Sequence, residues 1–170
     1  GSVLAFPYDW QRPAKTEEWA YQHCWNTLQE NRYIEFFFFP WATLIDLRRK
    51  AKHSEVKKYL DVLFRAPPKK TLIRATVIQH IYSSDVFALL EHLGITDVFW
   101  SHAKNEQLEI GGIRIHGFPL YPVCCDGTHP QQERLAPDSR KYLYSFIGAY
   151  DPQVYISNVR QWIFELPYRN

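Results

Sequence analysis

The stretch LIRATVIQHIYSSDVFALLEHLGITDVFWSHA, Leu72–Ala103, contains two apolar runs that end at histidines, His80 and His102. Both runs are rich in β-branched and aromatic residues, which predicts strands. The segment between them, 84–94, has the apolar spacing of a short amphipathic helix. A strand, a helix and a second strand in this order are typical of parallel strands joined by a crossover helix. The stretch therefore predicts an α/β fold.

The same alternation continues on both sides of this stretch. Apolar runs that predict strands lie at 3–8, 33–40, 108–125 and 141–150, and segments with helical spacing lie at 16–31, 41–51, 54–66 and 157–166. The residues 41–66 are interpreted as two helices or one broken helix. A layered domain with a doubly wound, mainly parallel, Rossmann-like sheet is expected.

Length and composition predict one domain. The chain has 170 residues, of which 46% are hydrophobic, enough for a single core. It contains no methionine, and it opens with Gly1 and Ser2, which are typical of the scar that tag removal leaves. We interpret the chain as an excised domain in which residues 1–2 are such a scar.

Charge and cysteine content exclude several classes of protein. The net charge is +2 and the basic residues are interspersed with acidic ones, so no nucleic-acid partner is expected; the basic residues 48–52 are interpreted as a solvated helix face. No apolar run approaches the roughly 18 residues of a membrane span.

Cys24, Cys124 and Cys125 lack the spacing of metal ligands, so no metal is expected. Their lack of a disulfide framework favours a reducing compartment, the cytoplasm.

The two histidines suggest where a site would lie. Ligands of parallel α/β sheets bind outside the carboxyl ends of the strands, where the chain turns from strand to helix. Since His80 and His102 close consecutive predicted strands, both should project at that edge. The alternative is that each imidazole only caps its strand and bonds to backbone, and the sequence leaves both interpretations open.

Motifs for phosphate loops and hydrolases are missing. Neither G-x-G-x-x-G after the first strand, nor a P-loop, nor G-x-S-x-G occurs. The expected edge carries carboxylates and aromatic rings, namely Asp9, Asp85, Asp126, Tyr8, Trp10, Trp41, Tyr82 and Trp100. Aromatic rings beside carboxylates and imidazoles favour a sugar site. Asp85 also suits a first-turn helix charge, and Asp126 a turn residue before Gly127.

Four strings of residues resemble one family. FFFFPWATLIDLRRKA, TVIQHI, LGITDVFWSHA and YLYSFIGAYDPQVYISNVRQWIFEL are similar to the exostosin-like glycosyltransferases, particularly the bacterial-type members. The last string carries an aromatic strand ending in S-F-x-G, with Ser145, Phe146 and Gly148, and then a helix that bears Arg160.

The resemblance implies one half of a GT-B enzyme. Residues 3–140 would be the Rossmann-like, acceptor-side domain, and 141–170 the strand and helix at the crossover to a C-terminal half. That half would hold the nucleotide-sugar donor, so this segment alone would bind no cofactor and is expected to be inactive. Because no D-x-D occurs, no metal is expected to bind here.

The implied reaction is transfer of a sugar from the nucleotide donor to a glycan hydroxyl, with inversion, which needs a general base. The candidate catalytic residues are His80, His102 and Asp126. The candidate substrate-binding residues are Tyr8, Trp10, Tyr82 and Trp100, together with Arg160, whose guanidinium would receive the diphosphate.

Two alternatives remain at this point. The first is a domain that binds a glycan or a protein without catalysis. The second is a thiol-dependent enzyme that uses Cys124 or Cys125, which would require a strongly lowered thiol pKa.

Overall fold

The fold was analysed in a computed structural model that describes residues 3–6, 9–12, 14–28, 31, 33–68, 70–106, 108–121 and 158–166. The chain divides into two compact units, Gly1–His129 and Pro130–Asn170. The second unit contributes one described helix, α5 (Val159–Glu165). Among the described residues, no helix is long and apolar enough to cross a lipid bilayer.

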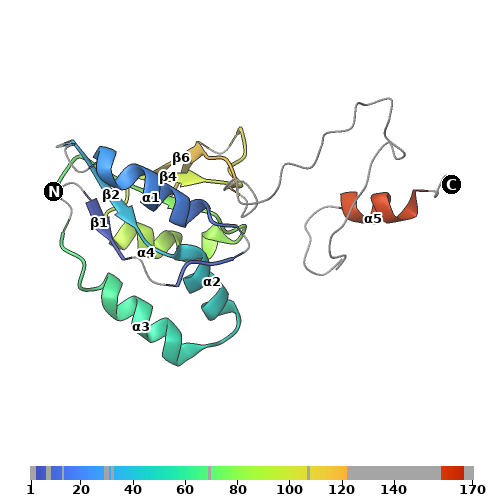
Figure 1. The fold of residues 1–170 in the computed structure, drawn as a ribbon, viewed down its shortest axis with the longest axis horizontal. Coiled ribbons are helices and arrows are strands. Elements are labelled where there is room, and N and C mark those ends of the chain that lie inside the picture. Colours follow the sequence, from blue (N-terminus) through green and yellow to red (C-terminus); the bar gives the residue numbers. More distant parts are fainter. Residues whose placement is uncertain are drawn as a thin grey trace, which may run out of the picture. The chain divides into compact units, whose positions relative to one another are not determined.

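The first unit is an α/β sheet domain (Figure 1). Its elements are β1 (Val3–Ala5), α1 (Thr16–Leu28), β2 (Ile34–Phe38), α2 (Trp41–Arg49), α3 (His53–Leu63), β3 (Ile73–Ile78), the 3-10 helix η1 (Ser83–Val86), α4 (Phe87–His92), β4 (Asp97–Trp100), β5 (Glu109–Ile110) and β6 (Ile113–Gly117). The strand order is β1-β2-β3-β4-β6-β5, and every neighbouring pair is parallel except β5 with β6. The predicted α/β fold with a mainly parallel sheet is confirmed.

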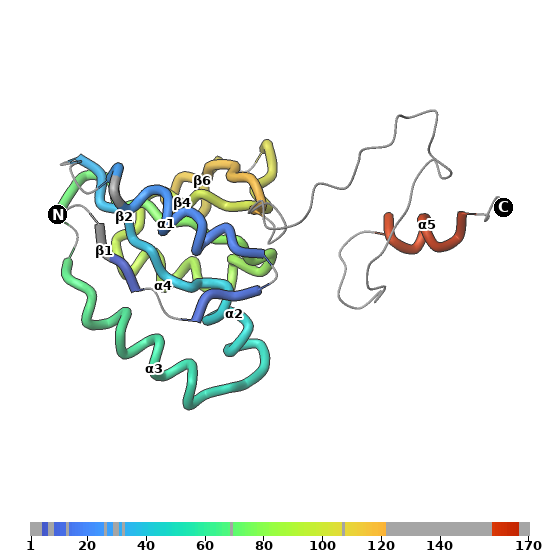
Figure 2. Tube along the Cα trace, in the orientation of Figure 1, coloured from blue at the N-terminus to red at the C-terminus, as the bar shows by residue number. Residues whose placement is uncertain are grey.

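Helices cover both faces of the sheet, because successive side chains of a strand point to opposite faces. Phe36 and Phe38 of β2 pack with Ala20 of α1. Phe37 and Phe39 pack on the other face, with α2, α3, η1 and α4. The phenylalanine run is therefore apolar throughout because both of its faces are buried. The path of the chain can be followed in Figure 2.

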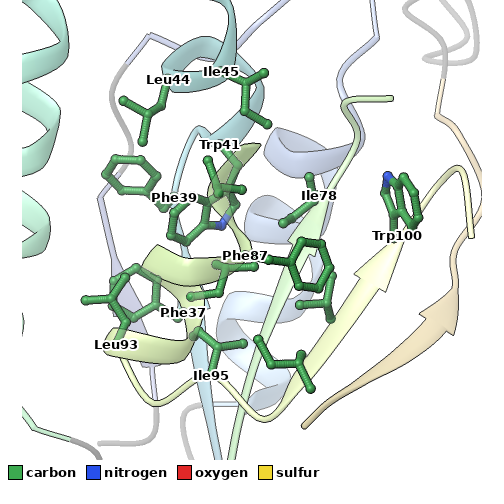
Figure 3. Close-up of a cluster of buried hydrophobic side chains, with 14 of the residues drawn as sticks. Phe37, Phe39, Trp41, Leu44, Ile45, Ile78, Phe87, Leu93, Ile95 and Trp100 are labelled. Atoms are coloured by element: carbon green, nitrogen blue, oxygen red, sulfur yellow. The ribbon is translucent and has the colours of Figure 1, made fainter. Parts of the chain in front are cut away.

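The larger core cluster lies under α2 and α4 (Figure 3). Trp41 is fully buried at the start of α2, and its indole N–H donates to the Thr76 hydroxyl oxygen of β3 at 2.8 Å. Thr76 in turn donates to the carbonyl oxygen of Phe37 at 2.5 Å. These bonds satisfy the polar atoms that the tryptophan and threonine bring into the core.

A buried ion pair joins β2 to β3. Glu35 and Arg74 are partners in the strand register, and both side chains are almost fully buried. The remaining guanidinium N–H groups of Arg74 donate to the carbonyl oxygens of Leu93 and Pro67, at 2.7 and 2.9 Å. Arg74 thereby ties the sheet to the loops that precede β3 and β4.

The strands β1 to β4 lie in chain order, whereas a doubly wound sheet reverses its order at the middle. The chain steps in the same direction from β1 to β2 and from β2 to β3. Because α1 and α2 lie on opposite faces, these two crossovers have opposite hands, an uncommon arrangement. The chain therefore leaves the carboxyl ends of β1 and β2 toward opposite faces.

Two local features refine the predicted elements. Residues 41–66 form two helices, separated at Ala51, whose φ is +53°. The strand-like run 108–125 begins as a hairpin that turns at Gly111 and Gly112, with φ of +57° and +80°. Those left-handed conformations suit glycine and let β5 run antiparallel. The predicted strand 141–150 lies outside the described residues.

Candidate functional site

His80 and His102 occupy equivalent places at the carboxyl edge of the sheet. Ile78 and Trp100 are partners in the register of β3 with β4, and each histidine lies two residues beyond its strand's last residue. The alternation of the strand continues past Ile78. Gln79 contacts α1 on one face, whereas His80 contacts α2 on the other.

Both ring nitrogens of His80 are hydrogen bonded. The backbone N–H of Tyr82 donates to Nδ1 at 3.1 Å, so the proton of the neutral ring lies on Nε2. Nε2 lies 3.2 Å from Oδ1 of Asp46 and donates to it. The His80 side chain is only 11% exposed. In this state it has no vacant lone pair with which to accept a proton.

Asp46 is the carboxylate partner of His80. Although burial raises the pKa of Asp46, hydrogen bonds from Gln11 and His80 and the charge of Lys50 lower it overall. The Gln11 amide donates to Oδ2 at 2.6 Å. Asp46 is therefore ionised near neutral pH, where it accepts the Nε2–H of His80 and fixes that tautomer.

His102 differs from His80 in its exposure and in its hydrogen bonding. It is exposed, and its ring makes no hydrogen bond within the described residues. Burial of part of the ring, and then the neighbouring His80, lower the pKa of His102 below its ordinary value. A neutral, accessible imidazole is the form that can accept a proton from a hydroxyl group. His102 is therefore better suited than His80 to act as a general base.

Tyr82 and two arginines of α2 pack together beside this pair. The guanidinium carbon of Arg49 lies 3.6 Å from the Tyr82 ring centroid, a cation–π contact. Arg49 also pairs with the Asp85 carboxylate at 3.1 Å, and Arg48 donates to the Asp85 carbonyl oxygen at 2.7 Å. The basic end of α2 is solvent-exposed, as the sequence pattern predicted, and its arginines also contact η1.

The two tryptophans predicted to bind substrate lie elsewhere. Trp100 is buried in the core, and its indole N–H donates to the His80 carbonyl oxygen at 2.9 Å. It therefore supports the His80 backbone and presents no open ring face for a sugar. Trp10 packs against Tyr21 of α1, on the other face of the sheet from Tyr82.

Among the other candidates, Asp9 lies at the start of the described loop that leads to α1, where its carbonyl oxygen accepts from Thr43 at 2.6 Å. Tyr8 and Asp126 lie outside the described residues. Arg160 is half-buried in α5 of the second unit. Within the described part of the chain, no group of three or more His, Cys, Asp and Glu side chains could hold a metal ion.

An apolar cavity of about 280 Å³ lies on the α1 face, lined by residues that include Cys24, Leu28, Phe36, Val77, Phe99 and Phe118. Burial raises the pKa of the Cys24 thiol, which keeps it protonated. The lining is mainly apolar, and His23 and Thr27 are its polar residues apart from Cys24. The chemistry of the described residues lies at the His80 edge instead.

The sequence analysis missed Asp46 and Gln11. Asp46 lies one turn into the helix that follows the carboxyl end of β2, a place from which it could have been considered. Comparison with protein-family models, with curated proteins and with solved structures finds no match for this chain. The candidate site therefore rests on the geometry of His80, His102, Asp46 and Tyr82.

Proposed function

We propose that the chain is the acceptor-side domain of a glycosyltransferase of GT-B architecture, which moves a sugar from a nucleotide donor to a glycan hydroxyl. The resemblance of its residue strings to the exostosin-like family supports this proposal. The observation that carries it is the neutral, accessible His102 beside the His80 to Asp46 pair, at the carboxyl edge of a parallel sheet.

In this proposal His102 takes the proton of the acceptor hydroxyl. The acceptor oxygen forms a bond to the anomeric carbon of the donor, and the bond from that carbon to the nucleotide diphosphate breaks. The diphosphate leaves with the electron pair, and the configuration at the anomeric carbon inverts. The donor would be held by a second half of the enzyme, and Arg160 would contribute to diphosphate binding.

His80 has a supporting role in this scheme. Its bond to the ionised Asp46 holds its ring in place. Burial of part of the His102 ring, and then the nearby His80, lower the pKa of His102. Tyr82, which packs beside His80 with ring centroids 5.7 Å apart, would contact the acceptor sugar.

A second candidate is a domain that binds glycans without catalysis. The complete hydrogen bonding of His80 within the protein favours it, because neither His80 nitrogen is left to contact a substrate. The two candidates share a glycan site and differ in whether His102 is needed for turnover.

The experiment has two steps. First, saccharides and phosphosugars are titrated into this chain while NMR follows its labelled imidazole and tyrosine rings. Saturable shifts at His102 and Tyr82, absent in His102→Ala, are expected, and His53→Ala is the matched control because His53 is exposed at the start of α3. A panel without saturable shifts would contradict both candidates.

Second, sugar nucleotides are incubated with the complete protein that contains this segment, and mass spectrometry measures transfer. Turnover that His102→Ala abolishes supports the transferase. Glycan binding with turnover unaffected by His102→Ala supports the binding domain.

A further inference from the structure

Glu17 is a buried acid that joins three elements at the carboxyl edge. It lies in the first turn of α1 and is only 2% exposed. Its Oε1 accepts the backbone N–H of Gln79 at 3.1 Å and that of Ala42, at the start of α2, at 3.2 Å. Its own N–H donates to the side-chain oxygen of Gln79 at 3.2 Å. One side chain thus holds α1, α2 and the end of β3 together.

The hydrogen bonds of Glu17 and the bond between His80 and Asp46 connect the same two elements, α2 and the end of β3. Ala42 and Asp46 are four residues apart and so share one face of α2. Gln79 and His80 are consecutive at the end of β3. The α2 helix and the end of β3 are therefore linked twice, first through Glu17 and then through the bond between His80 and Asp46. We expect a change in the hydrogen bonds of Glu17 to change the bond between His80 and Asp46 as well.

Hydrogen bonds between side chains form a second path. The Gln79 amide donates to the Gln11 side-chain oxygen at 3.2 Å and to the Ala14 carbonyl oxygen at 2.9 Å. Gln11 in turn donates to Asp46. The path Glu17, Gln79, Gln11, Asp46, His80 is continuous, and no mechanism proposed above uses Glu17.

The charges around Glu17 leave its own charge unpaired. On α1, the partly buried Glu18 is paired with the exposed Arg12. On α2, Asp46 has Lys50 at 3.7 Å, and beyond β3 stands His80. Within the described part of the chain no basic side chain bonds to Glu17. Burial raises the pKa of Glu17 to about 8, although the N–H groups of Gln79, Ala42 and Trp41 lower it, so both of its forms are populated just above neutral pH.

We propose that Glu17 is a positioning residue for His80, and that ionisation of its carboxyl group resets the hydrogen bond between His80 and Asp46. The protonated acid has only one good acceptor oxygen. The carboxylate has two and forms charge-assisted bonds, which are shorter and stronger. Gaining the charge draws Gln79 and Ala42 toward Glu17 and moves the His80 ring relative to Asp46. This holds whether or not the site transfers sugars.

The test is an NMR titration of the full chain from pH 5.5 to 9.5, with ¹³C-labelled histidine rings and glutamate carboxyl groups, assigned by through-bond correlations in the unmodified chain. The His80 ring signal should show, besides its own titration, a second inflection near pH 8 that coincides with the titration of the Glu17 carboxyl carbon. This comparison uses the unmodified chain, so it stands even if Glu17→Gln does not fold.

The variants give the second arm of the test. Glu17→Gln should lose the inflection of His80 near pH 8, and Glu18→Gln, whose carboxylate pairs with Arg12, should keep it. The proposal is wrong if the unmodified chain shows no such inflection or one at a different pH from the Glu17 carboxyl group. It is also wrong if folded Glu17→Gln keeps the inflection, or if Glu18→Gln loses it.

Discussion

At the scale of single residues, His80 and His102 follow their strands at the same distance but differ in hydrogen bonding and exposure. His80 bonds through both nitrogens to Asp46 and the Tyr82 backbone, whereas His102 is exposed and held neutral by partial burial and by His80. Only the second can accept a proton without first breaking a bond. Under the proposed reaction, the roles of the two residues should therefore separate in kinetics.

His102→Ala should lower kcat for sugar transfer by about 10²- to 10⁴-fold, the range for loss of a general base, in the complete protein. His80→Asn should cost less, because an amide can still bond to Asp46 and only positioning is disturbed. Steady-state kinetics with the sugar nucleotide identified in the transfer experiment measures kcat of both variants, with His53→Ala as the control. A larger loss for His80→Asn than for His102→Ala would reverse the assignment.

Glu17 should make the folded chain less stable as the pH rises. Its pKa is raised from 4.5 to about 8 in the folded state, so between these values the folded chain binds the extra proton. The resulting stability is fully present below pH 4.5 and is lost as the pH rises to about 8, with a slope of roughly 1.4 kcal/mol per pH unit. Glu17→Gln should remove this slope.

Urea unfolding of Glu17→Gln, of Glu18→Gln and of the unmodified chain at several pH values between 5 and 8 measures the effect. Glu18→Gln should retain the slope of the unmodified chain, because Glu18 pairs with Arg12 and is not fully buried as Glu17 is. Equal slopes for all three proteins would contradict the assignment of a neutral, buried Glu17.

At the scale of elements, the buried pair of Arg74 and Glu35 joins β2 to β3 and reaches the loops at Leu93 and Pro67. Arg74→Leu should lower the free energy of unfolding by about 3–5 kcal/mol, because it leaves Glu35 buried without a partner. The double variant Arg74→Leu, Glu35→Leu should recover only part of this loss, since the two carbonyl oxygens stay without donors.

Denaturant unfolding of the two single variants and the double variant gives the coupling between the residues. Arg12→Leu is the control, because Arg12 also pairs with a glutamate, Glu18, but is half exposed. Its loss should stay within about 1 kcal/mol. A loss for Arg74→Leu no larger than that for Arg12→Leu would mean that the pair does not hold the strands together.

At the scale of the whole molecule, both clusters of buried apolar side chains found in the described residues belong to the first unit. The predicted boundary at residue 140 stays a prediction, and the helix α5 belongs to the second unit. The first unit should therefore keep its fold when it is separated from the second.

A fragment of residues 1–129 should unfold cooperatively, with a midpoint close to that of the full chain, because none of the described core is removed. Urea unfolding followed by tryptophan fluorescence, together with the NMR signals of His80 and His102, checks this. A fragment without a cooperative transition would show that Pro130–Asn170 contributes to the core.

The sequence by itself determined most of the elements and the sheet edge at which His80 and His102 lie. Apolar runs with a strand-like pattern ended near His80 and His102, and helical spacing predicted the intervening helices, because these signals depend on residues close together in the chain. The alternation of predicted strands and helices indicated mainly parallel strands, since parallel neighbours require a crossover between them.

Only the tertiary structure decided which partners these residues have. Asp46 lies 34 residues from His80, and Glu17 lies 62 residues from Gln79. Strand order and the face taken by α1 bring them together, and neither leaves a local pattern in the chain. The tertiary contacts bond Nε2 of His80 to Asp46, lower the pKa of His102 and bury Glu17, because hydrogen bonding and desolvation depend on what surrounds a side chain in space.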